Sequence, residues 1–366
     1  MKNVAVFFGG QSVEHDISVI TGVMSLNSLD DNTFCGIPIY IDKNGEWYTG
    51  EVLKDLDNYK SLDYKKLLKV TLVCGDNCLY VLKKNKLKKF CALSVALNCL
   101  HGERGEDGCL YGLLSMCKIP LASPPITPSA VCMDKTFTKT VMKGLGVKTL
   151  NSITVSSLEQ LEKVKKNLNY PVIVKPNKSG SSIGVNKAVD DQTLKTALLY
   201  ALKFGESAII EPCLENFIEI NCACYQDSGG NIVVSECERP VGRNEVLTFG
   251  DKYKSGKRIF PADIDKKYSD KIKKITQKVY CEAGFTGVIR IDYFLVDKDI
   301  ILNEINTVPG SLAYYLFGNT LKTLTAILSE VINRALGDYA RSLSVQTEFK
   351  SGVLTGCVGK GAKVKR

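Results

Sequence analysis

The chain has 366 residues, of which 45% are hydrophobic and 24% charged, and its formal net charge is +9. This length and this balance predict a globular protein of two or three domains and exclude a disordered or fibrous chain. No apolar run approaches the ~20 residues of a membrane span, the first residues lack the features of a signal peptide, and fourteen cysteines are scattered singly. We therefore expect a cytoplasmic protein with reduced thiols and no membrane segment.

A strand, a glycine turn and a helix open the chain. Residues 4–8 are apolar and end at two glycines, and a helical pattern begins near Ser18. This order is typical of an α/β domain. A second buried strand is predicted over 93–100. The five lysines within 83–89 predict a solvated hairpin rather than a nucleic-acid surface, because no aromatic residues are interleaved with them.

The rest of the chain alternates helices and strands. Four prolines predict a linker over 120–128, and Ser157 with Gln160 matches a capping box at the start of a helix. The expected helices cover residues 134–145, 158–168, 193–202 and 321–336. The expected strands cover residues 171–175, 208–210, 218–225, 232–236, 288–296 and 300–305. A Gly/Ser turn is expected over 179–184 and a long polar loop over 242–256.

The two last predicted strands carry the most informative side chains. Alternation puts Arg290 and Asp292 on one face of the first strand, and Glu304 and Asn306 on one face of the second. If the strands pair as a hairpin, these groups converge. Two carboxylates and an amide oxygen suit Mg²⁺, which in turn implies nucleotide phosphates, and an arginine beside them would meet anionic charge. The alternative is an ordinary solvated hairpin with a polar face.

A lysine directly before a run of small polar residues favours the nucleotide interpretation. Lys175 ends a predicted strand, and serines and glycines follow over 179–184. Small residues let backbone N–H groups approach phosphate oxygens. The lysine precedes the glycines, so this is not a P-loop. A plain Gly/Ser hairpin is the alternative, but the metal-type hairpin downstream makes a phosphate site the better interpretation.

Three further polar residues follow predicted strands of the first unit. Glu14 and His15 come after the first strand, and His101 after a later one. Open α/β sheets bind ligands at the carboxyl ends of their strands. Each histidine is therefore either a substrate-binding group or a structural loop residue, and the sequence leaves both open.

Six motifs occur in the order found in D-alanine–D-alanine ligases, at residues 9–14, 101–108, 133–135, 175–184, 290–292 and 303–310. The chain resembles this family over essentially its whole length. The resemblance implies an α/β protein with the ATP-grasp fold, in which ATP lies between two sheets, and an N-terminal Rossmann-like domain with a parallel sheet. We expect that domain over 1–125, a central ATP-grasp subdomain over 126–210, and a C-terminal subdomain with metal site and closing loop over 211–366.

The resemblance also implies an activity. ATP-dependent ligation would join two D-alanine molecules through a D-alanyl phosphate, for peptidoglycan precursor synthesis, with ATP as co-substrate and two Mg²⁺ ions, or Mn²⁺, as metals. The expected assembly is a homodimer that binds no nucleic acid. Catalytic roles would fall on Glu14, Ser181, Tyr253, Arg290, Gly310 and Tyr315. ATP would be bound by Lys135, Lys175, Ser181, Ser182, Glu211, Leu214, Glu219 and Lys252. Metal would be bound by Asp292, Glu304 and Asn306.

Two departures from the family pattern fall around the second substrate. Tyr315 stands where a serine is usual, and the closing loop around Lys252 lacks an aromatic–acid pair often found ahead of the lysine. Either Tyr315 or Ser311 would then hold the second substrate's carboxylate, and D-serine and D-lactate stay open as alternatives to D-alanine. A dehydrogenase is disfavoured because no G-x-G-x-x-G follows the first strand.

Overall fold

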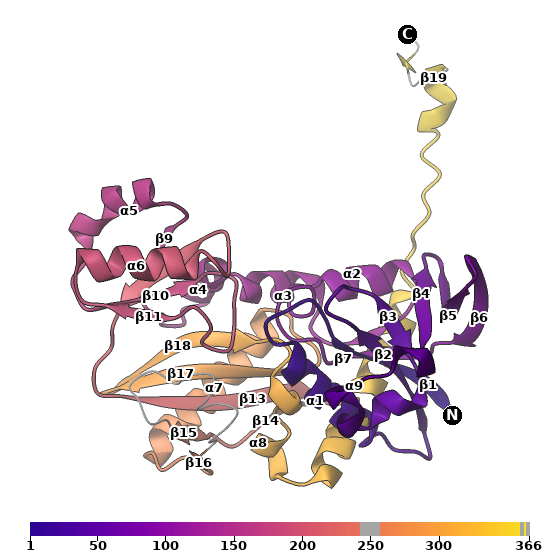
Figure 1. Cartoon of the computed structure of the whole chain (residues 1–366), viewed down its shortest axis with the longest axis horizontal. Helices are drawn as coiled ribbons and strands as arrows, with labels where there is room; N and C mark the ends of the chain where they lie inside the picture. Colours follow the sequence, from indigo (N-terminus) through magenta and orange to yellow (C-terminus); the bar gives the residue numbers. More distant parts are fainter. Residues whose placement is uncertain (242–256, 359–361, 364–366) are drawn as a thin grey trace.

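The computed structural model describes residues 1–241, 257–358 and 362–363, and within these ranges the strands form three larger sheets and two small ones (Figure 1). The first sheet has eight strands in the order β6-β5-β4-β3-β2-β1-β7-β8. These strands are β1 (Lys2–Gly9), β2 (Phe34–Ile41), β3 (Trp47–Thr49), β4 (Leu68–Val73), β5 (Asp76–Lys83), β6 (Lys86–Ala92), β7 (Val95–Asn98) and β8 (Leu121–Ala122). Strands β2, β1, β7 and β8 are parallel, as expected for a Rossmann-like unit, whereas β3 to β6 extend the sheet in antiparallel fashion.

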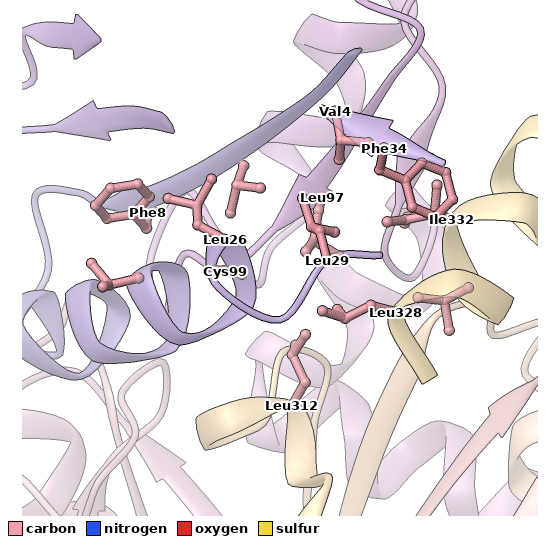
Figure 2. Close-up of a cluster of buried hydrophobic side chains, with 14 of the residues drawn as sticks. Val4, Phe8, Leu26, Leu29, Phe34, Leu97, Cys99, Leu312, Leu328 and Ile332 are labelled. Carbon is pink, nitrogen blue, oxygen red and sulfur yellow. The ribbon is translucent and has the colours of Figure 1, made fainter. Parts of the chain in front are cut away.

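Strand β1 lies in the middle of this sheet and is covered on both faces. Its five apolar residues 4–8 are fully buried, which explains the unbroken apolar run. Alternate side chains enter two cores, one with α1 (His15–Leu26) and α9 (Leu321–Ser342), the other with α2 (Cys109–Met116). In the first core Phe8 and Leu26 lie on one side and Leu328 and Ile332 of α9 on the other (Figure 2). The far end of the chain therefore helps to close the first sheet.

The second sheet has four antiparallel strands in the order β11-β10-β12-β9. They are β9 (Ile153–Val155), β10 (Val172–Pro176), β11 (Asn186–Ala188) and β12 (Ala208–Pro212). Helices α5 (Leu158–Val164) and α6 (Asp191–Ala201) pack on one face and bury Leu161, Leu194 and Leu198. The opposite face is directed toward the third sheet (Figure 1).

The third sheet has the order β14-β13-β17-β18 and is antiparallel throughout. Its strands are β13 (Phe217–Gln226), β14 (Ile232–Val234), β17 (Val288–Val296) and β18 (Asp299–Asn306). Helix α7 (Lys266–Glu282) covers one face through Ile272 and Val279. Helices α3 (Ile126–Met133) and α4 (Lys135–Gly144) also contact β18.

The remaining elements are short. A two-stranded sheet pairs β15 (Arg239–Val241) with β16 (Lys257–Ile259), and another pairs β19 (Cys357–Val358) with β20 (Ala362–Lys363). The short helices are η1 (Glu51–Lys54), η2 (Leu56–Lys60), η3 (Tyr64–Lys66), η4 (Lys165–Asn167), η6 (Gly310–Ala313), α8 (Tyr315–Gly318) and η7 (Val353–Gly356). In the part of the chain that the structure describes, no helix has both the length and the hydropathy needed to cross a membrane.

Several sequence expectations are confirmed and a few are wrong. The lysine-rich hairpin forms between β5 and β6, with Lys84 and Asn85 at positive φ in its turn. The expected linker over 120–128 instead contains β8 and the first turn of α3, because proline is tolerated in a first helical turn. The capping box is only half present: Ser157 accepts from Gln160 N–H, but the Gln160 side chain accepts from Ser156. The polar loop 242–256 lies outside the described residues.

Candidate functional site

The second and third sheets enclose a cavity between them. Apolar residues at one part of its wall include Ile173, Phe217 and Phe294. The polar residues of the wall come from four strands, α4 and the Gly/Ser turn, and they include Lys135, Lys175, Ser179, Ser182, Glu211, Glu219 and Glu304. The apolar Leu214, which follows β12, also lines the cavity. Nearly all the residues expected to bind ATP thus lie on one cavity. Lys252 lies outside the described residues, and Ser181 is not part of the cavity wall but donates to Glu14.

A buried carboxylate between two lysines is the strongest electrostatic feature of this cavity. Glu211 on β12 is 3% exposed, with Oε2 2.9 Å from Lys175 Nζ and Oε1 2.6 Å from Lys139 Nζ. Burial by itself would raise the pKa of Glu211, but the ammonium groups of Lys175 and Lys139 outweigh it and lower that pKa. Burial lowers the pKa of Lys139 despite its carboxylate partner. The Glu211 carboxylate thus lies within ion-pair distance of both ammonium groups, as a buried charge requires.

Each oxygen of this carboxylate faces one ammonium group, since Oε2 lies toward Lys175 and Oε1 toward Lys139. Lys175 and Glu211 line the cavity together with Lys135. Ammonium groups stabilise phosphate oxygens, and an apolar wall suits a flat ring such as a purine. The lysines and the apolar wall therefore fit a purine nucleotide with phosphates.

The Gly/Ser turn connects this cavity to the first sheet. Lys135 Nζ donates to the Ser179 carbonyl oxygen at 2.5 Å, and Ser181 Oγ donates to the buried Glu14 carboxylate. Ser181 and Ser182 both have positive φ, a strained conformation that tends to occur at ligand-binding turns. A Cβ at position 180 would lie 2.9 Å from Glu14 Oε2, so a larger residue there would displace the Glu14 carboxylate. Tertiary structure thus joins Glu14 and Ser181, which are 167 residues apart.

The hairpin of β17 and β18 brings the predicted metal ligands together, as expected. Asp292 lies directly opposite Glu304 in the register, and Asn306 Nδ2 donates to Asp292 Oδ2 at 3.2 Å. Arg290 holds Asp292 with two hydrogen bonds of 2.7 and 2.9 Å. Lys175 donates to Asn303 at 3.2 Å, which ties this hairpin to the phosphate-binding strand. Within the described ranges no group of three or more His, Cys, Asp or Glu side chains is arranged for a metal; this site has two carboxylates and an amide, all oxygen donors that suit Mg²⁺.

Tyr315 lies beside Arg290 and under a second arginine. Arg290 Nη1 donates to the Tyr315 hydroxyl at 3.4 Å, and the Arg258 guanidinium lies 4.6 Å from the ring centre. Burial raises the pKa of Tyr315, so the phenol stays protonated and can donate. Ser311 follows Gly310 at the start of η6, and its N–H donates to Thr21 Oγ1. Of the two residues considered for the second carboxylate, Tyr315 is therefore the one that contacts Arg290.

Both histidines are buried and have partners within the protein. His15 contacts the Gly10 carbonyl oxygen at 2.6 Å and the Tyr40 hydroxyl at 3.2 Å. His101 Nε2 is 2.9 Å from Thr21 Oγ1, which also accepts from Ser311 N–H. Burial lowers the pKa of His101 to about 4. The contacts of both histidines are thus those of structural residues. Through Thr21, His101 also supports the segment that begins with Gly310.

The lowered pKa of His101 predicts a pH-dependent stability. The unfolded chain binds the proton near pH 6.5 and the folded chain only near pH 4, so His101 favours folding above pH 6.5, and this contribution is lost as the pH falls toward 4. In urea titrations at pH 7 and pH 4.5 we expect the parent's free energy of unfolding to fall more than that of His101→Asn, by up to about 1.4 kcal/mol per pH unit. Parallel pH profiles for the two proteins would contradict this.

Sequence reasoning missed two residues that the structure places beside the site. Glu106 is a half-buried carboxylate that accepts from Gly102 N–H and Val308 N–H, both at 2.9 Å, and desolvation followed by the nearby Glu14 raises its pKa to about 8. Lys139 follows Lys135 by four residues on α4. That spacing places both lysines on one helix face, and it was the available signal for Lys139. Glu106 lies within the motif 101–108, but no local pattern shows that it contacts Val308, which is 202 residues away.

Comparison with known proteins identifies the family. The family described as D-ala D-ala ligase N-terminus matches residues 3–124, and that described as D-ala D-ala ligase C-terminus matches residues 143–336. The D-alanine–D-alanine ligases of Thermosipho melanesiensis and Thermosipho africanus are 38% and 35% identical to this chain, each over 92% of it and over 94% and 93% of their own lengths.

Solved structures agree. The D-alanine–D-alanine ligase of Helicobacter pylori superposes with a TM-score of 0.77 at 29% identity, covering 90% of this chain and 98% of that one. The VanG D-Ala:D-Ser ligase of Enterococcus faecalis gives 0.78 at 26% identity, covering 91% and 99%. The fold is thus the ATP-grasp fold preceded by a Rossmann-like sheet, as the resemblance implied. This chain belongs to the D-alanine–D-alanine ligase family.

Proposed function

We propose that this protein joins two D-alanine molecules into D-alanyl-D-alanine, with conversion of ATP to ADP and phosphate, for peptidoglycan precursors. The observation that carries the proposal is the cavity between the second and third sheets, which Lys175, Glu211 and Glu304 line together. The family to which the chain belongs supports the same reaction. Lysines for phosphate and apolar side chains for a base line that cavity, and so does Glu304 of the carboxylate pair for metal.

In the first step a D-alanine carboxylate oxygen attacks the γ-phosphorus of ATP, and ADP leaves. We assign Glu14 to the ammonium group of that D-alanine, which holds its carboxylate toward the nucleotide. Lys135 and Lys175, with the turn serines Ser181 and Ser182, offset the charge of the phosphates. Asp292, Glu304 and Asn306 would hold Mg²⁺, which would supply further charge neutralisation at the phosphates.

In the second step the neutral amine of a second D-alanine attacks the acyl carbon, phosphate leaves, and the nitrogen loses one proton, which the departing phosphate can take, to give the secondary amide. The tetrahedral oxyanion would be stabilised by Arg290 and by the Gly310 N–H. Arg290 is suited to this because its contacts with Asp292 fix the guanidinium in place. Tyr253 and Lys252 are assigned to the closing loop, outside the described residues, where they would exclude water from the acylphosphate.

The second substrate's carboxylate is assigned to Tyr315. A phenol in contact with Arg290 and stacked under Arg258 is a hydrogen-bond donor in a positively charged surrounding. A hydrogen bond to a charged group contributes about 1.5–3 kcal/mol. We expect Tyr315→Phe to raise the Michaelis constant of the second D-alanine about tenfold or more, with those of ATP and the first D-alanine unchanged. Steady-state rates over a wide D-alanine range separate the two constants.

Tyr314→Phe is the matched control for this prediction, since it makes the same change at the neighbouring ring, 6.1 Å away. Equal second-site constants for Tyr315→Phe and the parent would remove Tyr315 from the carboxylate site. Ser311 would then be the residue to test.

Product analysis tests the proposed function. The protein is incubated with ATP, Mg²⁺ and D-alanine, and then with equimolar D-alanine, D-serine and D-lactate, and the products are identified by mass spectrometry. We expect D-alanine-dependent ADP release and D-alanyl-D-alanine as the main product. D-alanyl-D-serine or D-alanyl-D-lactate as the main product would instead make this protein a D-alanine–D-serine or D-alanine–D-lactate ligase. The VanG structure with the same fold is named as a D-Ala:D-Ser ligase.

Three coarser expectations complete the proposal. We assign the reaction to the cytoplasm, where ATP is supplied. We expect the enzyme to be a homodimer, and light scattering of the purified protein tests this. The domain limits are proposed at 1–125, 126–210 and 211–366. The family matches over 3–124 and 143–336 support the first limit.

A further inference from the structure

Lys139 shares a carboxylate with a lysine of the nucleotide cavity. It is 4% exposed, its ammonium group is 2.6 Å from Glu211 Oε1, and it donates to the Leu150 carbonyl oxygen at 3.1 Å. Lys175 is 2.9 Å from the other oxygen, Oε2. Lys175 and Glu211 line the cavity, whereas Lys139 is not one of its described lining residues. One carboxylate is therefore divided between a lysine on the cavity wall and a lysine outside it.

This division affects the charge that the cavity offers to a phosphate. Two ammonium groups and one carboxylate carry a net charge of +1, in surroundings where solvent screens little. While Lys139 occupies Oε1, Glu211 has only Oε2 for Lys175. Without Lys139, both oxygens would be left to Lys175, because a buried carboxylate needs a cationic partner. The pair would then be neutral, and Lys175 would be drawn away from the phosphates and from Asn303, to which it donates at 3.2 Å.

We infer that Lys139 is a positioning residue that keeps Lys175 available to the phosphates of ATP by holding half of the Glu211 carboxylate. The inference rests on the proposed function only for the identity of the nucleotide. Lys139 touches neither substrate nor reacting atoms, and it acts through Glu211 and Lys175.

Lys139→Met tests this, because methionine fills a similar space without the charge. The dissociation constants of ATP and of adenosine are measured by calorimetry without D-alanine. For Lys139→Met we expect that of ATP to rise at least about tenfold. That of adenosine should change by less than about twofold, because adenosine has no phosphate to bind Lys175. Lys139→Arg keeps the charge and should retain the parent's preference for ATP.

Lys143→Met is the matched control. Lys143 lies one turn further along α4, is exposed, and contacts Asn151 at 3.4 Å. It should bind both ligands as the parent does. If Lys139→Met loses affinity equally for ATP and for adenosine, Lys139 only supports the fold and the inference is wrong. Unchanged ATP affinity in Lys139→Met would also overturn the inference.

A second variant protects the test from a folding defect. Glu211→Gln combined with Lys139→Met removes the carboxylate that would capture Lys175, so the ratio of the adenosine to the ATP dissociation constant should return toward the parent's value. A ratio that stays as low as in Lys139→Met contradicts the inference. Binding is measured without turnover: ADP release independent of D-alanine would count against the proposed function alone, whereas a parent that binds ATP no more tightly than adenosine overturns the inference about Lys139.

Discussion

Glu304→Gln should reduce kcat on the order of 10²- to 10³-fold, the scale found when one group that stabilises transition-state charge is removed. Glu304 lies on β18 directly opposite Asp292, in the wall of the nucleotide cavity. Glutamine keeps the shape of the side chain but removes the charge that would hold Mg²⁺ against the phosphates. Because the role assigned to Glu304 is in charge neutralisation at the phosphates, the loss should appear in kcat with ATP and Mg²⁺ saturating.

Glu282→Gln is the control for this prediction. Glu282 is the last residue of α7 and forms a long ion pair of 3.9 Å with Lys278. Because both side chains are exposed, this pair contributes little to stability. It should turn over at the parent's rate. If Glu304→Gln retains the parent's kcat and the parent's dependence on Mg²⁺ concentration, Glu304 does not bind the metal. Thermal unfolding of both variants separates a loss of chemistry from a loss of fold.

Arg290→Lys should lower kcat by at least about 100-fold, although the positive charge is kept. The guanidinium holds both oxygens of Asp292 and also reaches the Tyr315 hydroxyl. A single ammonium group cannot match this planar arrangement, so it would leave Asp292 and the developing oxyanion poorly placed. Rates of amide formation and of ATP consumption, measured together, would show whether the second step suffers more than the first.

Arg239→Lys offers a matched control. Arg239 also contacts both oxygens of an aspartate, Asp263, at 3.1 and 3.0 Å, but this pair is on the surface. Its replacement should leave kcat within twofold, roughly as expected for exposed pairs. Equal kcat values for Arg290→Lys and Arg239→Lys would remove Arg290 from the oxyanion site.

Local sequence patterns determined the elements that carry the chemistry. The period of two along β17 and β18 predicted that Asp292, Glu304 and Asn306 would share one face, and the register bears this out. The Gly/Ser turn, the lysine before it and the lysine hairpin were predicted in the same way, because turn geometry and strand alternation depend on neighbouring residues. Helix ends were less accurate: α9 runs to Ser342 rather than 336, although its last buried residue is Ala335. Ion pairs of Asp338 with Arg334 and Arg341 lie along these last turns.

Contacts between distant segments were decided by tertiary structure alone. No local pattern states that Glu14 meets Ser181, that Glu106 accepts from Val308, or that one buried carboxylate is divided between Lys139 and Lys175. Each depends on how two sheets and a turn are placed relative to one another, and on burial, which sets the strength of a charge contact. Sequence by itself determined which side chains share a strand or a helix face, because those distances are fixed by the backbone repeat. The tertiary structure decided which charges are removed from water and paired, because that depends on packing across the whole chain.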